Sequence, residues 1–198
     1  MSGRGYHHGN LRNALLAAAS ELVRERGARG FSVSEAARRV GVSSSAPYRH
    51  FPDRDAMLAA AALTGFVELE ERFESLPVVQ TFTDTAAHIA AEYVRFARED
   101  PSRFEMMFAH GIDKSKHADL LQQTFRVQER FEAALAQHLQ PTESIRRYSA
   151  ELWSIAHGAA TLAIGENMQH LVPDTQISEL ASSTATAWAQ GITEASGS

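Results

Sequence analysis

Small hydroxyls and a proline stand just before a run of hydrogen-bonding and basic side chains in residues 41–54, GVSSSAPYRHFPDR. The major groove of B-DNA admits one α-helix, whose N-terminal side chains read the base edges, so bulky residues there would hold the backbone away. Ser44, Ser45 and Ala46 would allow a close approach. Pro47 falls in a first helical turn, where most N–H groups lack partners, so its missing donor costs little. The pattern is typical of a recognition helix.

The side chains that follow would meet the phosphates beside the groove. Tyr48, Arg49 and His50 come where the DNA backbone would run, and Arg54 opens the next predicted helix, whose positive end also attracts a phosphate. The predicted DNA-binding residues are Arg4, His8, Ser32, Ser34, Ser43, Ser44, Ser45, Ala46, Tyr48, Arg49, His50 and Arg54. The alternative interpretation is a serine-rich loop with no partner.

Two predicted helices precede this segment and would hold it in place. Apolar side chains recur at helical spacing over 11–22, with Asn10 as the N-cap and Gly27 just past the end. Ser32 and Glu35 have the spacing of a capping box, in which each side chain bonds a free backbone N–H. A second helix should therefore start at Ser32.

Helix, glycine turn and short helix together form a helix-turn-helix. Gly41 would end the second helix, Ser43 would cap a third that ends near Phe51, and a long fourth helix would cover about 53–75. Helical spacing continues to the end of the chain, in predicted helices over about 86–100, 101–110, 118–140, 143–170 and 175–192. We predict an all-α fold of about nine helices.

Charge is divided unevenly along the chain, whose formal net charge is −5. Residues 1–55 hold nine Arg or Lys against five Asp or Glu, whereas residues 56–198 hold ten against nineteen. A basic segment favours an anionic partner such as nucleic acid, and the acidic remainder argues against coating of DNA by the whole molecule. The alternative is ordinary scatter of surface charge.

Composition excludes several classes of protein. The 198 residues contain no cysteine, which removes disulfides and thiolate metal sites and favours a reducing cytoplasm. No apolar run approaches the roughly 20 residues of a membrane span. Motifs of common hydrolases, metalloproteases and nucleotide-binding enzymes are missing, so we predict no enzyme activity and no cofactor or metal.

Residues 27–58, GARGFSVSEAARRVGVSSSAPYRHFPDRDAML, resemble the DNA-binding domain of the TetR/AcrR family of bacterial transcriptional regulators. The shared features are the second helix, the G-V-S turn, the Y-x-H-F segment and the basic residue that opens the fourth helix. The family usually has Lys where this sequence has Arg54, which keeps the charge but changes the contact geometry. The segments YHHGNLR and ELWSIAHG resemble a subgroup named for a Trp, His, Gly signature.

This resemblance implies two domains: a helix-turn-helix DNA-binding domain with a flexible N-terminal arm over 1–55, and a helical ligand-binding and dimerisation domain over 56–198. It also implies a homodimer that reads a palindromic operator. Stripes of small side chains on the last two predicted helices would allow close approach of a second subunit. The predicted interface residues are Ser154, Gly158, Thr161, Gly165, Ala181, Thr184 and Trp188. These stripes could instead pack within one subunit.

An apolar effector pocket is the last expectation from the family. Its predicted residues are Phe66, Phe73, Phe104, Met107, Phe108, Phe125, Trp153 and His157. Such side chains can equally form plain core, and His157 can be a ligand contact or a core hydrogen-bonding residue. We predict a repressor that a small, largely apolar effector releases from its operator. The alternatives are an activator of the same fold and a sequence-tolerant nucleoid-type protein that binds DNA without an effector.

Overall fold

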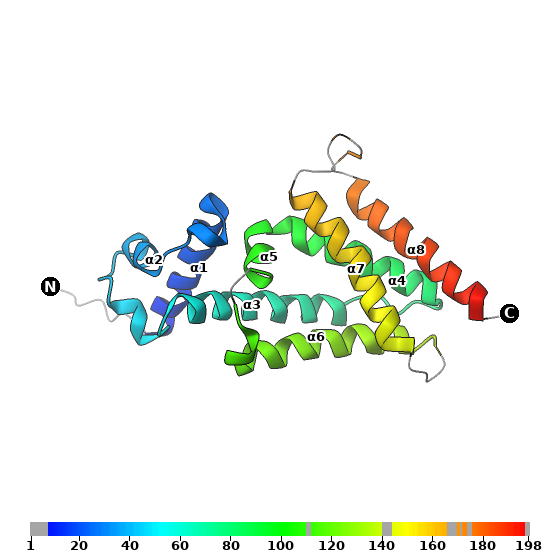
Figure 1. Ribbon diagram of the computed structural model, residues 1–198, viewed down its shortest axis with the longest axis horizontal. Helices are drawn as coiled ribbons and strands as arrows, with labels where there is room; N and C mark the ends of the chain where they lie inside the picture. Colours follow the sequence, from blue (N-terminus) through cyan, green and yellow to red (C-terminus); the bar gives the residue numbers. More distant parts are fainter. Residues whose placement is uncertain are drawn as a thin grey trace. The chain divides into compact units, whose positions relative to one another are not determined.

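The computed structural model describes residues 8–109, 112–139, 144–165, 170, 172–173 and 176–196, and every regular element within these residues is helical (Figure 1). The α-helices are α1 (His8–Arg26), α2 (Val33–Val40), α3 (Arg54–Glu74), α4 (Phe82–Glu99), α5 (Pro101–Met107), α6 (Ala118–Ala136), α7 (Ser144–Ile164) and α8 (Ile177–Ser196). Three 3-10 helices are η1 (Ala28–Gly30), η2 (Ala46–Arg49) and η3 (Lys114–Lys116). The predicted all-α fold is confirmed. Among the helices of the described chain, none has the length and hydropathy to cross a bilayer.

Packing divides the chain into two units. Unit 1 comprises residues 1–66 and 101–123, and unit 2 comprises residues 67–100 and 124–198. Both α3 and α6 therefore contribute residues to each unit. The short helix α5 packs with α1 in unit 1, although the two are far apart in the sequence. The predicted assignment of 1–55 to DNA binding and 56–198 to ligand binding and dimerisation stays a prediction.

Two glycines end the first helices of unit 1, as the sequence predicts. Gly27 follows α1 with φ of 71°, and Gly41 follows α2 with φ of 77°. This left-handed region strains side chains with a Cβ, which is why glycine stands at both positions. The Gly41 N–H donates to the carbonyls of Ala37 and Arg38, so α2 is closed where the turn begins.

Helix starts in unit 1 differ from the predictions in their details. α1 begins at His8, so Asn10 lies inside the helix and is not its N-cap. Ser32 does stand at the N-cap of α2, but its side chain makes no capping hydrogen bond. Glu35 instead accepts from Arg26 at 2.7 Å and from Arg38 at 2.9 Å. The predicted capping box is therefore wrong, because two guanidinium groups compete for its carboxylate.

The predicted recognition helix is shorter and tighter than an α-helix. It is the four-residue 3-10 helix η2. The Ser43 carbonyl accepts from the Ala46 N–H at 3.0 Å, whereas the Ser43 hydroxyl lies 3.1 Å from that of Ser45. Ser43 therefore starts the turn through its backbone and does not cap it through its side chain.

In unit 2, α4 packs against α7 and α8 (Figure 1). Thr81 caps α4, with its hydroxyl oxygen accepting from the Asp84 N–H at 3.0 Å. The core side chains come from all three helices and include Ile89, Tyr93, Phe96, Leu152, Ala156, Ala181 and Ala185. The helix α6 ends at Ala136 and α7 ends at Ile164, a few residues before the predicted limits of 140 and 170.

Candidate functional site

The turn between α2 and α3 presents short polar side chains on a buried support. Ser44 and Ser45 are exposed, and 50% of Tyr48 is exposed. Pro47 is buried, and its carbonyl accepts from the backbone N–H groups of His50 and Phe51, both at 2.9 Å. Phe51 is only 2% exposed and anchors the end of the turn in the core. The structure thus gives Pro47 the supporting role that its position predicts.

The other predicted contacts fall into three groups. Ser32, Ser34, Ser43 and Arg49 are exposed, while Ala46 and His50 are half-buried. Arg4, and the side chain of His8 at the start of α1, lie outside the described residues. The described members that border the turn are therefore open to a partner.

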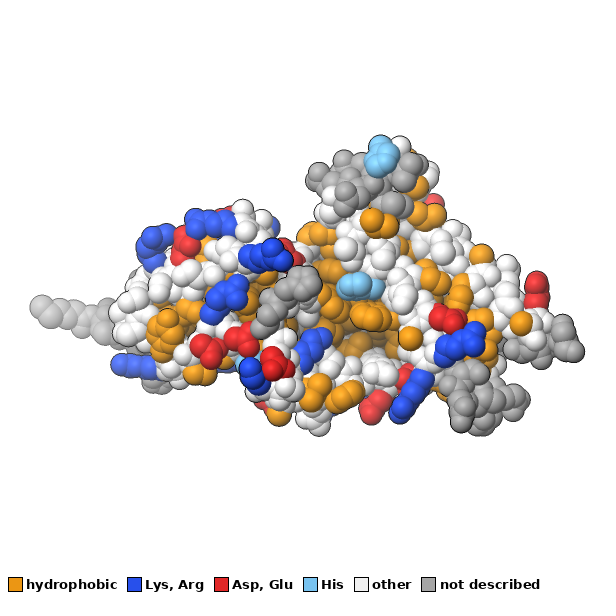
Figure 2. All heavy atoms as spheres, in the orientation of Figure 1, with side chains coloured by type: hydrophobic (Ala, Val, Ile, Leu, Met, Phe, Trp, Pro, Cys, Tyr) orange, Lys and Arg blue, Asp and Glu red, His pale blue; other side chains and the backbone are white. Residues whose placement is uncertain are grey.

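Basic side chains near the turn differ in whether they pair with carboxylates. Arg39 donates to both carboxylate oxygens of Glu25 at 2.8 Å and to Glu21 at 3.4 Å. This bidentate bond raises the pKa of Arg39 and lowers that of Glu25. Arg39 therefore ties α2 to α1. By contrast, no carboxylate of the described chain pairs with Arg49, whose charge stays available. Figure 2 shows Lys and Arg side chains over the region of α1 and α2 on the visible face.

The partly buried side chain of Arg54 donates to the backbone around η1. Its Nε donates to the Phe31 carbonyl at 3.2 Å and its Nη2 to the Ala28 carbonyl at 2.5 Å. The guanidinium also lies 5.8 Å from the centre of the Phe31 ring. Arg54 is therefore an internal brace, because the first turn of α3 brings it to the two carbonyls around η1, and its phosphate contact stays a prediction.

Glu105 is a residue that sequence reasoning missed. Its Oε1 accepts from the Ala28 N–H at 2.7 Å, although 77 residues separate the two. One peptide segment at η1 is therefore held by α5 through its N–H and by α3 through its carbonyl. No local spacing signals this contact, because it depends on the packing of α5 in unit 1.

Four of the predicted effector residues meet in unit 1. The ring of Phe108 lies 5.6 Å from that of Phe66 and 4.9 Å from that of Phe104. Met107 is buried beside Gly65, where an added Cβ would come within 2.6 Å of the Met107 Sδ. Lys114, which the sequence did not single out, places Nζ 4.6 Å from the Phe66 ring centre, and burial lowers the pKa of Lys114.

Three others meet in unit 2 around the buried Tyr93. The Trp153 indole N–H donates to the Tyr93 hydroxyl at 3.3 Å, and the His157 Nδ1 lies 2.9 Å from the same oxygen. The Phe73 ring stacks 6.5 Å from that of Tyr93. Because His157 is half-buried, its pKa falls below the ordinary value, and burial raises the pKa of Tyr93. His157 is thus a hydrogen-bonding residue of this cluster.

Phe125 belongs to neither aromatic group. It is 54% exposed on α6, so its predicted place in an apolar interior is wrong. The helical spacing that suggested it does not distinguish a core face from a neighbouring surface position.

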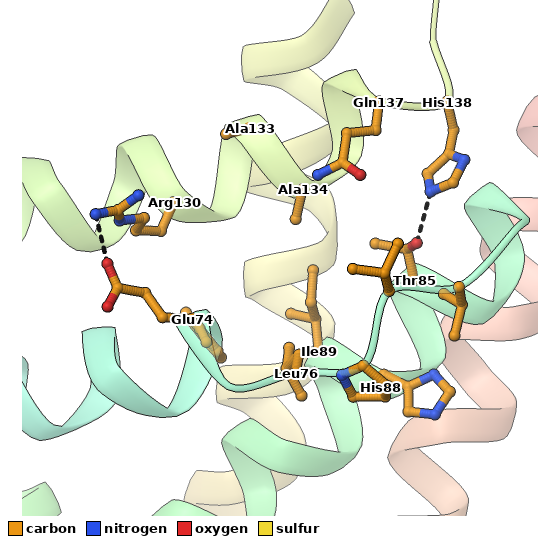
Figure 3. A pocket seen from close by; sticks show the side chains of 14 residues that line it. Glu74, Leu76, Thr85, His88, Ile89, Arg130, Ala133, Ala134, Gln137 and His138 are labelled. Carbon is orange, nitrogen blue, oxygen red and sulfur yellow. Dashed lines mark hydrogen bonds and ion pairs between the residues drawn. The ribbon is translucent and has the colours of Figure 1, made fainter.

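A pocket of about 400 Å³ opens in unit 2 (Figure 3). The end of α3 and the loop after it, α4, and the end of α6 supply its walls. Of the predicted effector residues, only Phe73 lines it. The Thr85 hydroxyl lies 2.8 Å from His138 Nε2 across one side, and Arg130 pairs with Glu74 on another. The pocket therefore combines an apolar interior with a few polar groups, which is the usual make-up of a ligand site.

The predicted dimer stripe on α7 is exposed in the single chain. Ser154, Gly158, Thr161 and Gly165 all face solvent, and an added Cβ at Gly158 would meet nothing within 4 Å. Two large apolar side chains of the same helix, Trp153 and Leu162, are also 44% and 43% exposed. An apolar helix face open in this way is a candidate interface.

The α8 stripe is only partly available. Thr184 is exposed, but Ala181 is 1% exposed and packs inside the subunit, so its predicted contact with a partner is wrong. Trp188 is half-buried against Phe82 and donates its indole N–H to Glu151 at 2.9 Å. On α8 the small-residue spacing therefore mixes a core face with an exposed one. No group of metal-binding side chains occurs in the described part of the chain.

Two family profiles match this sequence. Residues 86–186 match the profile described as "Tetracyclin repressor-like, C-terminal domain", and residues 15–61 match that of "Bacterial regulatory proteins, tetR family". No curated protein sequence matches the chain.

Solved structures share the fold over nearly the whole length. A protein of unknown function from Rhodococcus sp. RHA1 is 27% identical, with a TM-score of 0.76 over 94% of this chain and 99% of that chain. A transcriptional regulator from the same organism is 23% identical, with a TM-score of 0.72 over 91% and 96%. The regulator FadR from Bacillus subtilis, in complex with stearoyl-CoA, is 12% identical, with a TM-score of 0.70 over 88% and 97%.

Proposed function

Because the chain belongs to the TetR family of DNA-binding transcriptional regulators, we propose that it is a repressor that binds a palindromic operator as a homodimer and is released by a small effector. It would act in the cytoplasm as a regulator rather than as an enzyme. Its membership of the subgroup with a Trp, His, Gly signature stays part of this proposal.

The observation that carries the proposal is the exposed turn on its buried support. Ser44, Ser45 and Tyr48 stand in solvent, while Pro47 and Phe51 hold the backbone beneath them. Short hydroxyl side chains let a backbone approach base edges, and the exposed charge of Arg49 suits a phosphate beside the groove. These four exposed side chains are the proposed centre of the DNA contact.

A homodimer would cover the exposed face of α7. Gly158 and Gly165 would let a helix of the second subunit approach closely, and Trp153 and Leu162 would lose their contact with water. A dimer related by a two-fold axis presents two reading turns, which match a palindromic operator.

Release by an effector would act through α3, which runs from Arg54 to Glu74 and supplies residues to both units. An effector that binds more tightly to one position of this helix shifts operator affinity by that difference in binding free energy. A coupling of about 1 to 3 kcal/mol changes the affinity roughly 5- to 150-fold. The aromatic groups around Phe66 and Tyr93 stay candidates for sensing the effector.

A genome-wide map of the DNA fragments bound by the purified protein tests the proposal. We expect one or a few palindromic sites, with sharply weaker binding elsewhere. Uniform coverage would instead identify a nucleoid-type protein. Transcription in vitro from a bound promoter then separates repression from activation, because a repressor lowers the transcript level until the effector is added.

A further inference from the structure

We infer that the pocket of Figure 3 binds the effector, and that the effector is an apolar molecule carrying a hydrogen-bond donor, an amine or a hydroxyl, rather than an organic acid. The inference rests on the proposed function, in which a small molecule controls DNA binding. The pocket's volume of about 400 Å³ lies within the usual range for small-molecule sites.

The body of the ligand would be apolar. Ile89, which is 1% exposed, lines the pocket together with Phe73 and Leu76. Val78, in the loop between α3 and α4, also lines it, yet 84% of this residue is exposed. A hydrophobic ligand against Val78 would remove that surface from water, which favours binding.

The hydrogen bonds of His138 determine what it can offer a ligand. The Thr85 hydroxyl donates to the Thr81 carbonyl at 3.1 Å, since a carbonyl can only accept. With its proton on this bond, the Thr85 oxygen accepts from His138 Nε2 across the 2.8 Å contact (Figure 3). A neutral imidazole carries one proton, so Nδ1 of His138 is left as an acceptor.

His88 reaches the same state through a different contact. Its Nδ1 lies 2.7 Å from the Asp84 carbonyl oxygen, so this nitrogen carries the proton and donates. Nε2 of the neutral ring is then an acceptor. Both histidines that line the pocket therefore carry an acceptor nitrogen when neutral, and a ligand hydroxyl or amine N–H would bond to one of them.

The charges around the pocket disfavour an acid. Of the described residues that line it, only Arg130 has a permanent positive charge. Its Nε lies 3.4 Å from Glu70, and its Nη2 pairs with Glu74 (Figure 3). A ligand carboxylate that approached this guanidinium would also face the negative charges of Glu70 and Glu74. A protonated amine would instead be attracted to these carboxylates.

A matched series of ligands tests this preference on the full-length protein by titration calorimetry. The probes are phenylbutylamine, phenylbutanol, phenylbutanoate and butylbenzene, which share one apolar body. We expect the amine or the alcohol to bind at least about tenfold more tightly than both the acid and the hydrocarbon, a difference of about 1.4 kcal/mol. Equal or tighter binding of phenylbutanoate would overturn the inference, and so would equal binding of butylbenzene.

Two variants locate the binding site. Ala133 is exposed on α6 and lines the pocket, so Ala133→Trp should fill it and abolish binding of the preferred probe. Gln128→Trp places the same indole on an exposed position of α6 that does not line the pocket, and binding should be unchanged. His138→Phe should reduce the preference for donor-bearing probes over butylbenzene. Undiminished binding to Ala133→Trp contradicts the assignment.

Operator binding without any probe separates this inference from the proposed function. If the free protein binds a specific operator and other compounds release it equally from wild type and Ala133→Trp, the pocket assignment is wrong and the regulator stands. If no specific operator is bound at all, the proposed function fails, whatever the calorimetry gives.

Discussion

The carboxylate of Glu105 accepts a hydrogen bond from the backbone N–H of Ala28 at 2.7 Å. The backbone carbonyl of Ala28 accepts a second hydrogen bond, from the Arg54 guanidinium, at 2.5 Å. Side chains from α5 and α3 therefore both hydrogen-bond to the backbone of Ala28, directly after Gly27, where α1 ends. Two helices that lie later in the chain therefore position the backbone between α1 and α2, which precedes the turn at η2.

Replacement of Arg54 should first lower stability and only then affect DNA binding. Arg54→Ala leaves the carbonyls of Ala28 and Phe31 without their charged donor, and we expect a loss of about 1 to 3 kcal/mol in the free energy of unfolding. Chemical denaturation measures this loss. Arg49→Ala, at an exposed unpaired position, serves as the control and should unfold like the wild type. If Arg54→Ala left the stability unchanged, Arg54 would not support the fold, and a DNA contact would be its main role.

Replacement of Arg49 should weaken DNA binding and leave stability unchanged. Arg49→Ala should weaken operator binding at unchanged thermal stability, because a phosphate contact carries affinity without supporting the fold. The slope of log affinity against log salt concentration should fall in magnitude by about 1 per subunit. Fluorescence anisotropy with a labelled operator at several salt concentrations measures both effects. An unchanged slope would mean that Arg49 contacts no phosphate.

The exposed face of α7 predicts how the subunits associate. Gly158→Glu would place a charge where a helix of the second subunit approaches in the proposed dimer, so that dimer should dissociate into monomers. Light scattering after gel filtration measures the mass, and Gln128→Glu on α6 is the matched control. A Gly158→Glu protein that stays dimeric with full operator affinity would place the interface on another surface.

The lowered pKa of His157 predicts how stability depends on pH. Burial places the pKa of His157 in the folded chain below its unfolded value of about 6.5. As the pH falls, His157 of the unfolded chain therefore takes up its proton first. The free energy of unfolding should therefore decrease as the pH drops below about 6.5, and this loss should end below the folded pKa. Urea denaturation between neutral and mildly acidic pH should show this slope, and His157→Gln should remove its contribution. An equal slope in both proteins would assign the dependence to other groups.

Local signals in the sequence predicted the elements of this fold well. Gly27, Gly41 and Pro101 each act on their own backbone dihedrals or hydrogen bonds, so their effects follow from residue type, and helices end or begin beside them. The capping box failed because Arg26 and Arg38 compete for Glu35, and one of them comes from another helix.

The site was harder to predict than the fold. The exposed serines and Tyr48 lie as their pattern indicated, since the turn that presents them is local. The internal hydrogen bonds of Arg54 were not predicted, because its partners are 23 and 26 residues away. The pocket lining brings residues of α3 together with those of α6, and helical spacing alone does not reveal which faces meet.

The close approach of Gly65 and Met107 limits how the sequence can change over time. A side chain at position 65 would overlap the thioether of the buried Met107, so the Met107 side chain would have to shift. A smaller residue at position 107 would remove this overlap. In related sequences, the side-chain sizes at positions 65 and 107 should therefore covary inversely.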